Sequence, residues 1–324
     1  MKKTLVSGVQ PTGRPHIGNY FGAMKQFVDL QDAYNAYIFI ADFHAITKVQ
    51  NSAELHQSII DLALDYLAIG LDPKKIILFK QSDIPEVTEL AWIFSCVTTV
   101  PYLMRAHAFK DAEAKNKEVN VGLFNYPILM AADILLPGAE IVPVGKDQRQ
   151  HVEIARDIAE KFNRIFGDTF KLPEAKILES VATVPGIDGQ KMSKSYKNTI
   201  PLFASDEEIR AAVMKIPTDS AGINDSKNPD ESILFQIHSL ILDEKSKDEL
   251  RNKFRNGGVG YKDLKEGLIK DLTNFISPIR MRRESFEKDI PGVLKILQEG
   301  GQKIRKIIEP KMVEIRQKVG NKLY

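Results

Sequence analysis

Cysteine is nearly absent from this 324-residue chain, in which Cys96 is the only one. A single cysteine excludes an intrachain disulfide bond and a metal site built from several thiolates. The chain is not a polycation either, because 45 Lys and Arg residues stand against 43 Asp and Glu residues and leave a formal net charge of +2. Any contact with nucleic acid must therefore come from local basic faces.

Long apolar segments are missing as well. The stretch that follows Met1-Lys2-Lys3 ends at Ser7-Gly8, too early for the apolar segment of a signal peptide. No other segment has the apolar length that a membrane-spanning helix needs. We therefore expect a soluble, cytoplasmic protein without membrane association.

The chain is large enough for more than one core. Hydrophobic residues make up 43% of it, which allows one large core and a smaller one. Two domains are expected, and one large α/β domain with an appendage fits equally well.

The first 200 residues alternate between β-rich and helical segments. Short β-rich runs occur at residues 4–9, 37–41, 76–79 and 141–144. Helical spacing of apolar residues occurs at 18–30, 53–69, 90–100, 128–136 and 147–166. This order predicts an α/β fold with a doubly wound, Rossmann-like parallel sheet and right-handed crossovers. The charged stretch 110–121 is expected to be a loop or an insertion.

Beyond residue 200 the segments are mainly helical and rich in Lys and Arg. The predicted helices lie at 206–215, 230–242, 246–254, 260–276, 278–288 and 292–319. We therefore predict a Rossmann-like domain over residues 1–200 and a C-terminal α-helical domain over residues 201–324.

The first candidate site is the turn after the first strand, Gln10-Pro11-Thr12-Gly13-Arg14-Pro15-His16-Ile17-Gly18-Asn19. In an open parallel sheet, ligands bind where the strands end. Gly13 permits a tight bend, and Gly18 permits a ligand to approach the backbone closely. His16 and Asn19 can donate hydrogen bonds to a phosphate. A Gly/Pro turn with a surface histidine is an equally good interpretation of these residues alone.

The second candidate site is the segment Gly189-Gln190-Lys191-Met192-Ser193-Lys194-Ser195. Lysine ammonium groups are mobile point charges that can follow a triphosphate as charge builds on it. Taken by itself, the segment also fits a solvated basic loop.

Together the two segments resemble the signatures of the class I aminoacyl-tRNA synthetases. Lys191 to Ser195 matches the second signature completely, and a given pentapeptide arises by chance in such a chain at a frequency on the order of 10⁻⁴. The first signature differs from the usual family pattern at its last position, where Asn19 replaces a histidine. This variant is familiar in the tryptophanyl and tyrosyl branch.

Further segments resemble the bacterial tryptophanyl members of this family. They are Gly18–Tyr20, Asp42–Thr47, Tyr126–Leu135 and Val142–Gln148. With the two signatures they span most of residues 1–200, whereas the C-terminal third matches only in helical character and length.

The resemblance implies a tryptophan pocket. The indole N–H is a donor without acceptor capacity, so the pocket needs one buried acceptor among apolar walls. By resemblance Asp133 is that acceptor; alternatively, it caps or ends a helix. The other implied pocket residues are Met130, Val142 and Val144 as walls, Tyr126 and Gln148 for the ammonium or carboxylate, and His44, which can equally be a core histidine. Trp92 is expected to be packing.

The resemblance also implies ATP as a substrate, accompanied by Mg²⁺ that phosphates and water hold, with no metal site made by the protein. His16, Asn19, Lys191 and Lys194 are the implied catalytic residues. The full implied ATP-binding set is Gln10, Pro11, Thr12, Gly18, Asn19, Gly145, Lys146, Asp147, Val184, Lys191, Met192, Ser193, Lys194 and Ser195. Lys146 departs from the acidic residue expected there, so its contact is expected through the backbone.

The implied activity is that of a tryptophan–tRNA ligase, which forms tryptophanyl-adenylate and then charges tRNA(Trp). The helical region should read the anticodon, and residues 83–125 should form a homodimer interface. Candidate phosphate contacts are Arg280, Arg282, Arg283, Lys303, Arg305 and Lys306. Three alternatives stay open: a tyrosyl enzyme, a small-molecule nucleotidylyltransferase, and a catalytically silent RNA-binding relative.

Overall fold

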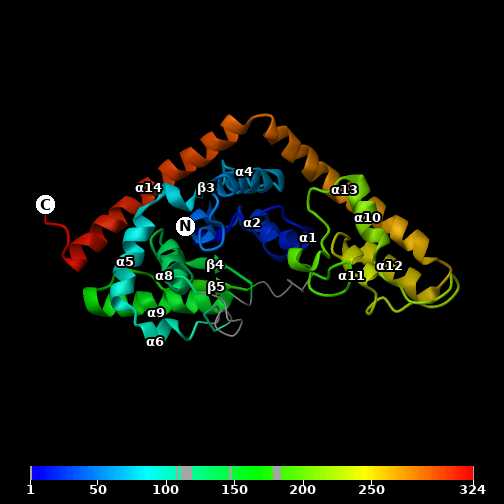
Figure 1. Cartoon of the computed structure of the whole chain (residues 1–324), viewed down its shortest axis with the longest axis horizontal. Helices are drawn as coiled ribbons and strands as arrows, with labels where there is room; N and C mark the ends of the chain where they lie inside the picture. Colours follow the sequence, from blue (N-terminus) through cyan, green and yellow to red (C-terminus); the bar gives the residue numbers. More distant parts are fainter. Residues whose placement is uncertain (1, 107–108, 111–118, 146–147, 178–183, 324) are drawn as a thin grey trace. The chain divides into compact units, whose positions relative to one another are not determined.

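The computed structural model describes residues 2–106, 109–110, 119–145, 148–177 and 184–323. The chain divides into two compact units, each discontinuous in sequence (Figure 1). The sheet unit comprises Met1–Gly13, Phe27–Leu178 and Asp289–Tyr324, and the helical unit comprises Arg14–Gln26 and Glu179–Lys288. The units therefore do not divide at residue 200: the last helix belongs to the sheet unit, and the first signature belongs to the helical unit. The predicted roles of the two parts stay predictions.

The sheet unit is built on five parallel strands in the order β3-β2-β1-β4-β5. The strands are β1 (Thr4–Val9), β2 (Asn35–Ile40), β3 (Ile77–Lys80), β4 (Ile141–Pro143) and β5 (Glu174–Lys176). The predicted α/β fold with a parallel sheet is thereby confirmed. The order reverses between β1 and β4, and in such sheets ligands bind beyond the carboxyl ends of the strands at this point.

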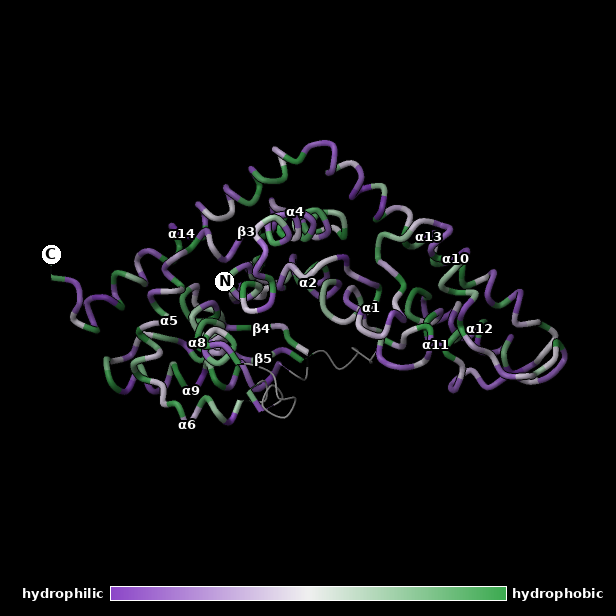
Figure 2. The backbone as a smooth tube through the Cα atoms, viewed as in Figure 1, coloured by the Kyte–Doolittle hydropathy of each residue, from purple (hydrophilic) through white to green (hydrophobic). Residues whose placement is uncertain are grey.

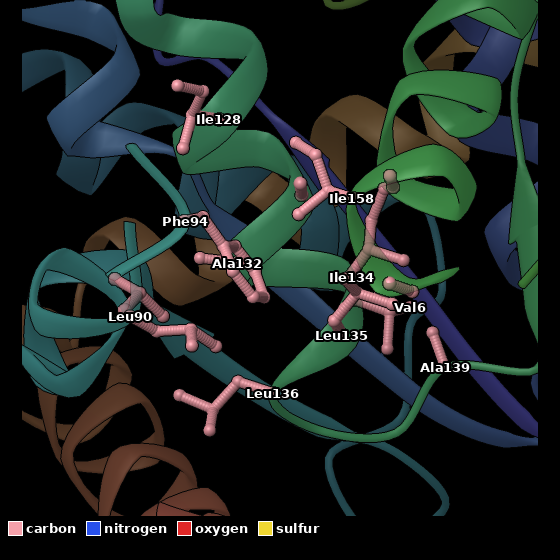
Figure 3. Packing of buried hydrophobic residues seen from close by; sticks show 14 of the residues in the cluster. Val6, Leu90, Phe94, Ile128, Ala132, Ile134, Leu135, Leu136, Ala139 and Ile158 are labelled. Carbon is pink, nitrogen blue, oxygen red and sulfur yellow. The ribbon is translucent and has the colours of Figure 1, made fainter. Parts of the chain in front are cut away.

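One face of the sheet carries the main hydrophobic core. Val6, Phe39 and Phe79 alternate with residues of the opposite face and join a cluster with helices that cover this side. Figure 3 shows Val6 and Leu135 together with other members of this cluster. On the other face Ile38 is fully buried. Because both faces are covered, the central strands are apolar throughout, which explains why the sequence pattern was unambiguous for them.

The helices of the sheet unit follow the predicted segments in part, since the helices predicted at 90–100 and 128–136 begin earlier, at Glu86 and Val121. They are α3 (Asp42–Ala45), α4 (Ser52–Ala68), η2 (Gln81–Asp83), α5 (Glu86–Val97), α6 (Val100–Leu103), α8 (Val121–Leu135), α9 (Arg149–Phe166) and α14 (Ile290–Val319). α2 (Lys25–Leu30) spans the boundary between the units. Most of the expected loop or insertion at 110–121 lies outside the described residues.

The C-terminal helix α14 packs against β3 and α4. Its buried residues recur every three or four positions, as at Val293, Leu297 and Ile304, and the hydropathy colours alternate along it in Figure 2. At Gly300 the helix approaches the strand so closely that an added Cβ would lie 1.8 Å from the carbonyl oxygen of Leu78. A helix therefore covers the edge strand β3, which protects its edge from pairing with other chains.

The helical unit contains residues 14–19 of the first signature segment, the whole second signature segment and the remaining helices. These are α1 (Ile17–Asn19), the π-helix η1 (Tyr20–Met24), η4 (Lys194–Tyr196), α10 (Asp206–Met214), α11 (Ile233–Ser239), α12 (Glu244–Asn256) and α13 (Tyr261–Glu287). The predicted break between 276 and 278 is wrong, because α13 continues through Pro278. Proline removes one N–H donor, but buried Ile276 and Ile279 hold the helix on both sides of it.

Among the helices of the described residues, none is both long enough and apolar enough to span a membrane.

Candidate active site

The predicted site residues fall into two groups, one in each unit. The helical unit holds His16, Gly18, Asn19, Val184 and Lys191–Ser195. The sheet unit holds Gln10, Pro11, Thr12, His44, Tyr126, Met130, Asp133, Val142, Val144, Gly145 and Gln148. The predicted contacts of Lys146 and Asp147 lie outside the described residues.

In the first signature, His16 and Asn19 form a capping box at the start of α1. The backbone N–H of His16 donates to Oδ1 of Asn19 (3.1 Å), and the backbone N–H of Asn19 donates to Nδ1 of His16 (3.2 Å). A Cβ placed on Gly18 would lie only 2.8 Å from Nδ1 of His16. Glycine at this position is therefore required by the imidazole ring itself, a reason that the sequence did not reveal.

The capping box also fixes the protonation of His16. A backbone N–H can only donate, so Nδ1 must be unprotonated and the ring proton must lie on Nε2. Burial, and to a smaller extent the positive charge of Lys194, together lower the pKa of His16 to about 4. At neutral pH His16 is thus a neutral imidazole with one defined donor, the Nε2–H group, which suits a phosphate oxygen.

The lysine loop is held by Asn198, which the sequence analysis missed. Its buried side chain accepts a hydrogen bond from the backbone N–H of Ser193 (2.8 Å) and donates to the carbonyl of Lys191 (3.2 Å) and to Asp188 (2.7 Å). No motif marks Asn198, which follows the signature pentapeptide by three positions. These hydrogen bonds from Asn198 to the lysine loop involve the loop backbone, and they do not involve the lysine ammonium groups.

Met192 anchors the lysine loop next to the first signature. Its backbone N–H donates to the carbonyl of Val184 (2.9 Å), and its buried Cβ would lie 3.3 Å from a Cβ on Gly18. The side chains of Lys191 and Lys194 are exposed on the same loop. The structure therefore brings two mobile cations and one neutral donor together, a combination that suits a polyphosphate.

In the sheet unit, Asp133 is a buried carboxyl on the interior of α8, with 4% of its surface exposed. Nε2 of His44 lies 2.9 Å from its Oδ2, and Nε2 of Gln81 lies 2.9 Å from both of its oxygens. The side chain thus neither caps nor ends α8. A carboxylate can accept about four hydrogen bonds. These three contacts leave capacity for one more donor.

Burial raises the pKa of Asp133, while hydrogen bonds from His44 and Gln81 favour its ionised form and oppose that rise. The nearby carboxyl of Asp42 raises the pKa further. The ionised state matters because only a carboxylate without a proton offers all of its oxygen lone pairs to a donor.

Gln81 is a second residue that the sequence analysis missed. It is fully buried, and its Oε1 accepts a hydrogen bond from the backbone N–H of His44 (3.3 Å). Gln81 directly follows β3, so its place at the carboxyl end of a strand was the only signal that could have identified it.

A cavity of about 270 Å³ lies beside this cluster and is lined by His44 and Tyr126 among others. The Tyr126 ring packs edge-on against His44, with ring centroids 6.1 Å apart, and its hydroxyl lies 2.6 Å from Nε2 of His151. Trp92 also lines the cavity and is 73% exposed, so the expectation that it is packing is wrong.

Other predicted residues of the sheet unit have less specific positions. Val142 lies in the hydrophobic core, and Met130 and Val144 pack against that core. None of the three lines the cavity, and their role as pocket walls stays a prediction. The backbone N–H of Gln148 donates to the carbonyl of Gly145 (3.0 Å).

Comparison with known proteins places these features in a family. Residues 2–277 match the family model of class I tRNA synthetases (W and Y). A tryptophan–tRNA ligase of Rhodopirellula baltica is 48% identical over 94% of this chain and 95% of its own length. One of Fusobacterium nucleatum is 48% identical over 99% of this chain and 98% of its own.

A solved structure extends the similarity to three dimensions. The tryptophanyl-tRNA synthetase of Campylobacter jejuni, complexed with ADP and tryptophan, has a TM-score of 0.92 and 44% sequence identity, covering 98% of this chain and 99% of that one. With both signatures present and relatives of this similarity along nearly its whole length, the chain belongs to the tryptophanyl-tRNA synthetases of class I.

Proposed function

We propose that this chain joins L-tryptophan to tRNA(Trp) at the expense of ATP. The observation that carries the choice of amino acid is Asp133, a buried carboxyl that His44 and Gln81 contact and that retains acceptor capacity. An indole N–H can use that capacity, whereas a phenyl side chain would leave it unsatisfied at a free-energy cost.

The reaction has two steps. A carboxylate oxygen of tryptophan attacks the α-phosphorus of ATP, the bond to the bridging oxygen breaks, and pyrophosphate leaves. A hydroxyl of the 3′-terminal ribose of the tRNA then attacks the acyl carbon, and AMP leaves. No protein nucleophile takes part, so catalysis rests on alignment of the reactants and on stabilisation of charge.

Each signature has a role in the first step. The Nε2–H group of His16 donates to a phosphate oxygen, and Asn19 holds the imidazole in the required tautomer while its amide contacts phosphate. Lys191 and Lys194 bind the β- and γ-phosphates as pyrophosphate departs. Gln10, Pro11 and Thr12 line the nucleotide site, while Gly145, Lys146 and Asp147 contact the ribose.

Mg²⁺ accompanies ATP in this proposal and is held by phosphates and water. Within the described residues no group of three His, Cys, Asp or Glu side chains is placed to hold a metal ion. The phosphates of ATP would therefore supply the main oxygen ligands.

A tyrosyl enzyme is the nearest competing function, since the family model covers both specificities. The segment Met130-Ala131-Ala132-Asp133 and the curated relatives, which carry the tryptophan name at 46–48% identity, favour tryptophan. The joint presence of His16, Asn19 and the two loop lysines argues against a small-molecule nucleotidylyltransferase and against a catalytically silent relative.

We also propose a homodimer through residues 83–125. Large apolar side chains are exposed along the described part of this segment: Trp92 (73%), Val100 (59%), Met104 (45%) and Val121 (74%). A second copy of the chain would remove this apolar surface from water.

Of the six basic residues predicted to contact tRNA phosphates, three form ion pairs with carboxylates of this chain. Arg280 binds Asp206, Arg283 binds Glu287, and Arg305 binds Glu86. Phosphate would have to compete with these carboxylates. Exposed side chains make Lys303 and Lys306 the better candidates.

The direct test is aminoacylation of tRNA(Trp) and tRNA(Tyr) transcripts with each amino acid. Charging of tRNA(Trp) with tryptophan alone supports the proposal. Charging of tRNA(Tyr) with tyrosine would overturn the specificity, and no charging by a folded protein would favour the silent relative.

A further inference from the structure

Gln81 bridges the proposed indole acceptor and the helix that carries its histidine. Its Oε1 accepts from the backbone N–H of His44, and its Nε2 donates to both oxygens of Asp133. The orientation of this amide is not arbitrary. The backbone N–H can only donate, so the oxygen must face it, and the NH₂ group must face the carboxyl.

The hydrogen bonds that Gln81 donates favour the ionised state of Asp133. Both Gln81 and the backbone are fixed as described, so Asp133 receives donors and has to act as an acceptor. A protonated Asp133 would present an O–H group that conflicts with the N–H of indole, because two donors cannot hydrogen-bond to each other. The ionised form, by contrast, satisfies Gln81 and still accepts from indole.

The segment that carries Gln81 is held in place by α3. Asp42 accepts hydrogen bonds from the backbone N–H of Ser82 (2.9 Å) and from its hydroxyl (2.5 Å). In return Gln81 accepts from the backbone N–H of His44 on the same helix. Two opposite hydrogen-bonded links thus fix η2 against α3, so the amide of Gln81 has little freedom to leave Asp133. Gln81 is also fully buried, which removes competition from water.

We propose that Gln81 is a specificity-determining positioning residue, which holds the carboxylate of Asp133 ionised and oriented so that the enzyme selects an amino acid with an indole N–H donor. Gln81 acts through Asp133 and does not itself touch the reacting atoms. This inference rests on the proposed function, because it assumes that tryptophan is the substrate that Asp133 recognises.

The test compares tryptophan with 3-(3-benzothienyl)-L-alanine, in which sulfur replaces the indole N–H. Gln81→Met keeps the length of the side chain and removes both the donor and the acceptor. In ATP–pyrophosphate exchange, the ratio of kcat/KM for tryptophan to that for the analogue should fall by about ten- to a hundredfold relative to the wild type. The variant should discriminate less between tryptophan and the analogue, because no hydrogen bond from residue 81 holds Asp133 in the ionised, accepting form.

A matched control exists in the same unit. Gln31 is a buried glutamine whose Nε2 donates to the carbonyl of Gly70 (3.2 Å) and whose Oε1 accepts from the backbone N–H of Asp72 (3.0 Å). Gln31→Met removes the same kind of hydrogen bonds away from Asp133. It should lower the thermal unfolding temperature and leave the ratio of the two substrates unchanged.

The pH dependence gives a second readout that a merely structural role would not move. His44 and Asp42 are the other ionisable groups that act on Asp133. Loss of the Gln81 donor removes one interaction that favours the carboxylate. The acid limb of kcat/KM for tryptophan should therefore move to higher pH in Gln81→Met and stay in place in Gln31→Met.

Should Gln81→Met fail to fold, Gln81→Glu keeps the shape and the acceptor for the N–H of His44 but offers an oxygen to Asp133. It should also reduce the substrate ratio, and more strongly at high pH, where both carboxyls ionise. A ratio within about twofold of the wild type in the folded variants would overturn the inference. The proposed function fails separately, if the wild-type protein itself shows no exchange with tryptophan.

Discussion

Nδ1 of His16 accepts a hydrogen bond from the backbone N–H of Asn19 across 3.2 Å. This contact places the ring proton on Nε2, and burial with the nearby Lys194 keeps the ring neutral. The first signature therefore offers phosphate a neutral donor rather than a cation, and the positive charge comes from the lysine loop.

The first prediction concerns the titration of His16. Its pKa in the folded state, about 4, lies below the ordinary value of 6.5, so between these values the unfolded chain binds more protons. Acidification through this range should lower the free energy of unfolding, and the stability is fully present above pH 6.5. NMR of histidine-labelled protein should show the His16 signal unchanged from pH 8 to about pH 5. A His16 midpoint near 6.5 would contradict the assigned tautomer and burial.

The second prediction separates the two kinds of lysine in the second signature region. Lys194→Gln should reduce the rate of ATP–pyrophosphate exchange by about a hundredfold, because it removes one positive charge that stabilises the departing pyrophosphate. Lys197→Gln is the control, since Lys197 is an exposed lysine at the end of the same 3₁₀ helix and is not part of the signature. Equal losses in both variants would indicate a general effect of charge in the loop rather than a specific clamp.

The third prediction concerns the packing of α14 against β3. Gly300→Ala would place a methyl group against the carbonyl of Leu78, so it should destabilise the protein by about 2 kcal/mol or more. Gly267→Ala is the matched helical control, because a Cβ there meets nothing closer than 3.9 Å. It should stabilise by about 0.5–1 kcal/mol. Thermal unfolding distinguishes the two, and a neutral Gly300→Ala would mean that the helix is not in contact with the strand.

The parts of the fold that depend on hydrophobic pattern were predictable. β1 was predicted at its observed bounds, and α4, α9 and α10 were displaced by at most two residues. β5 was missed because Glu174-Ala175-Lys176 is short, polar and at the edge of the sheet, so it carries no apolar alternation. The break predicted between 276 and 278 was wrong, because tertiary packing holds α13 as one helix through Pro278.

For the site, the sequence identified the residues that belong to motifs and missed those that hold them. Asn198 and Gln81 lie outside any signature, and each is recognisable only once the chain has folded around it. The reason for Gly18 was also hidden, because the contact with the His16 ring follows from the capping geometry and not from a ligand. Trp92 was expected to be packing, although it lies exposed on α5.

The fourth prediction concerns assembly. If residues 83–125 form a homodimer interface, Trp92→Glu should shift the protein to a monomer at micromolar concentration in size-exclusion chromatography with light scattering. Ile165→Glu is the control, since Ile165 is also an exposed apolar side chain (50%) but lies on α9 outside this segment. A wild-type monomer, or the same shift in both variants, would contradict this interface.

The most direct test of the whole account is ATP–pyrophosphate exchange with each of the twenty amino acids in the absence of tRNA. We expect exchange with tryptophan alone, and its loss in Asp133→Ala while the variant stays folded and binds ATP. Exchange with tyrosine would keep the fold and the two-step chemistry and contradict the role of Asp133. No exchange with any amino acid, in a folded protein that binds ATP, would contradict the proposed activity itself.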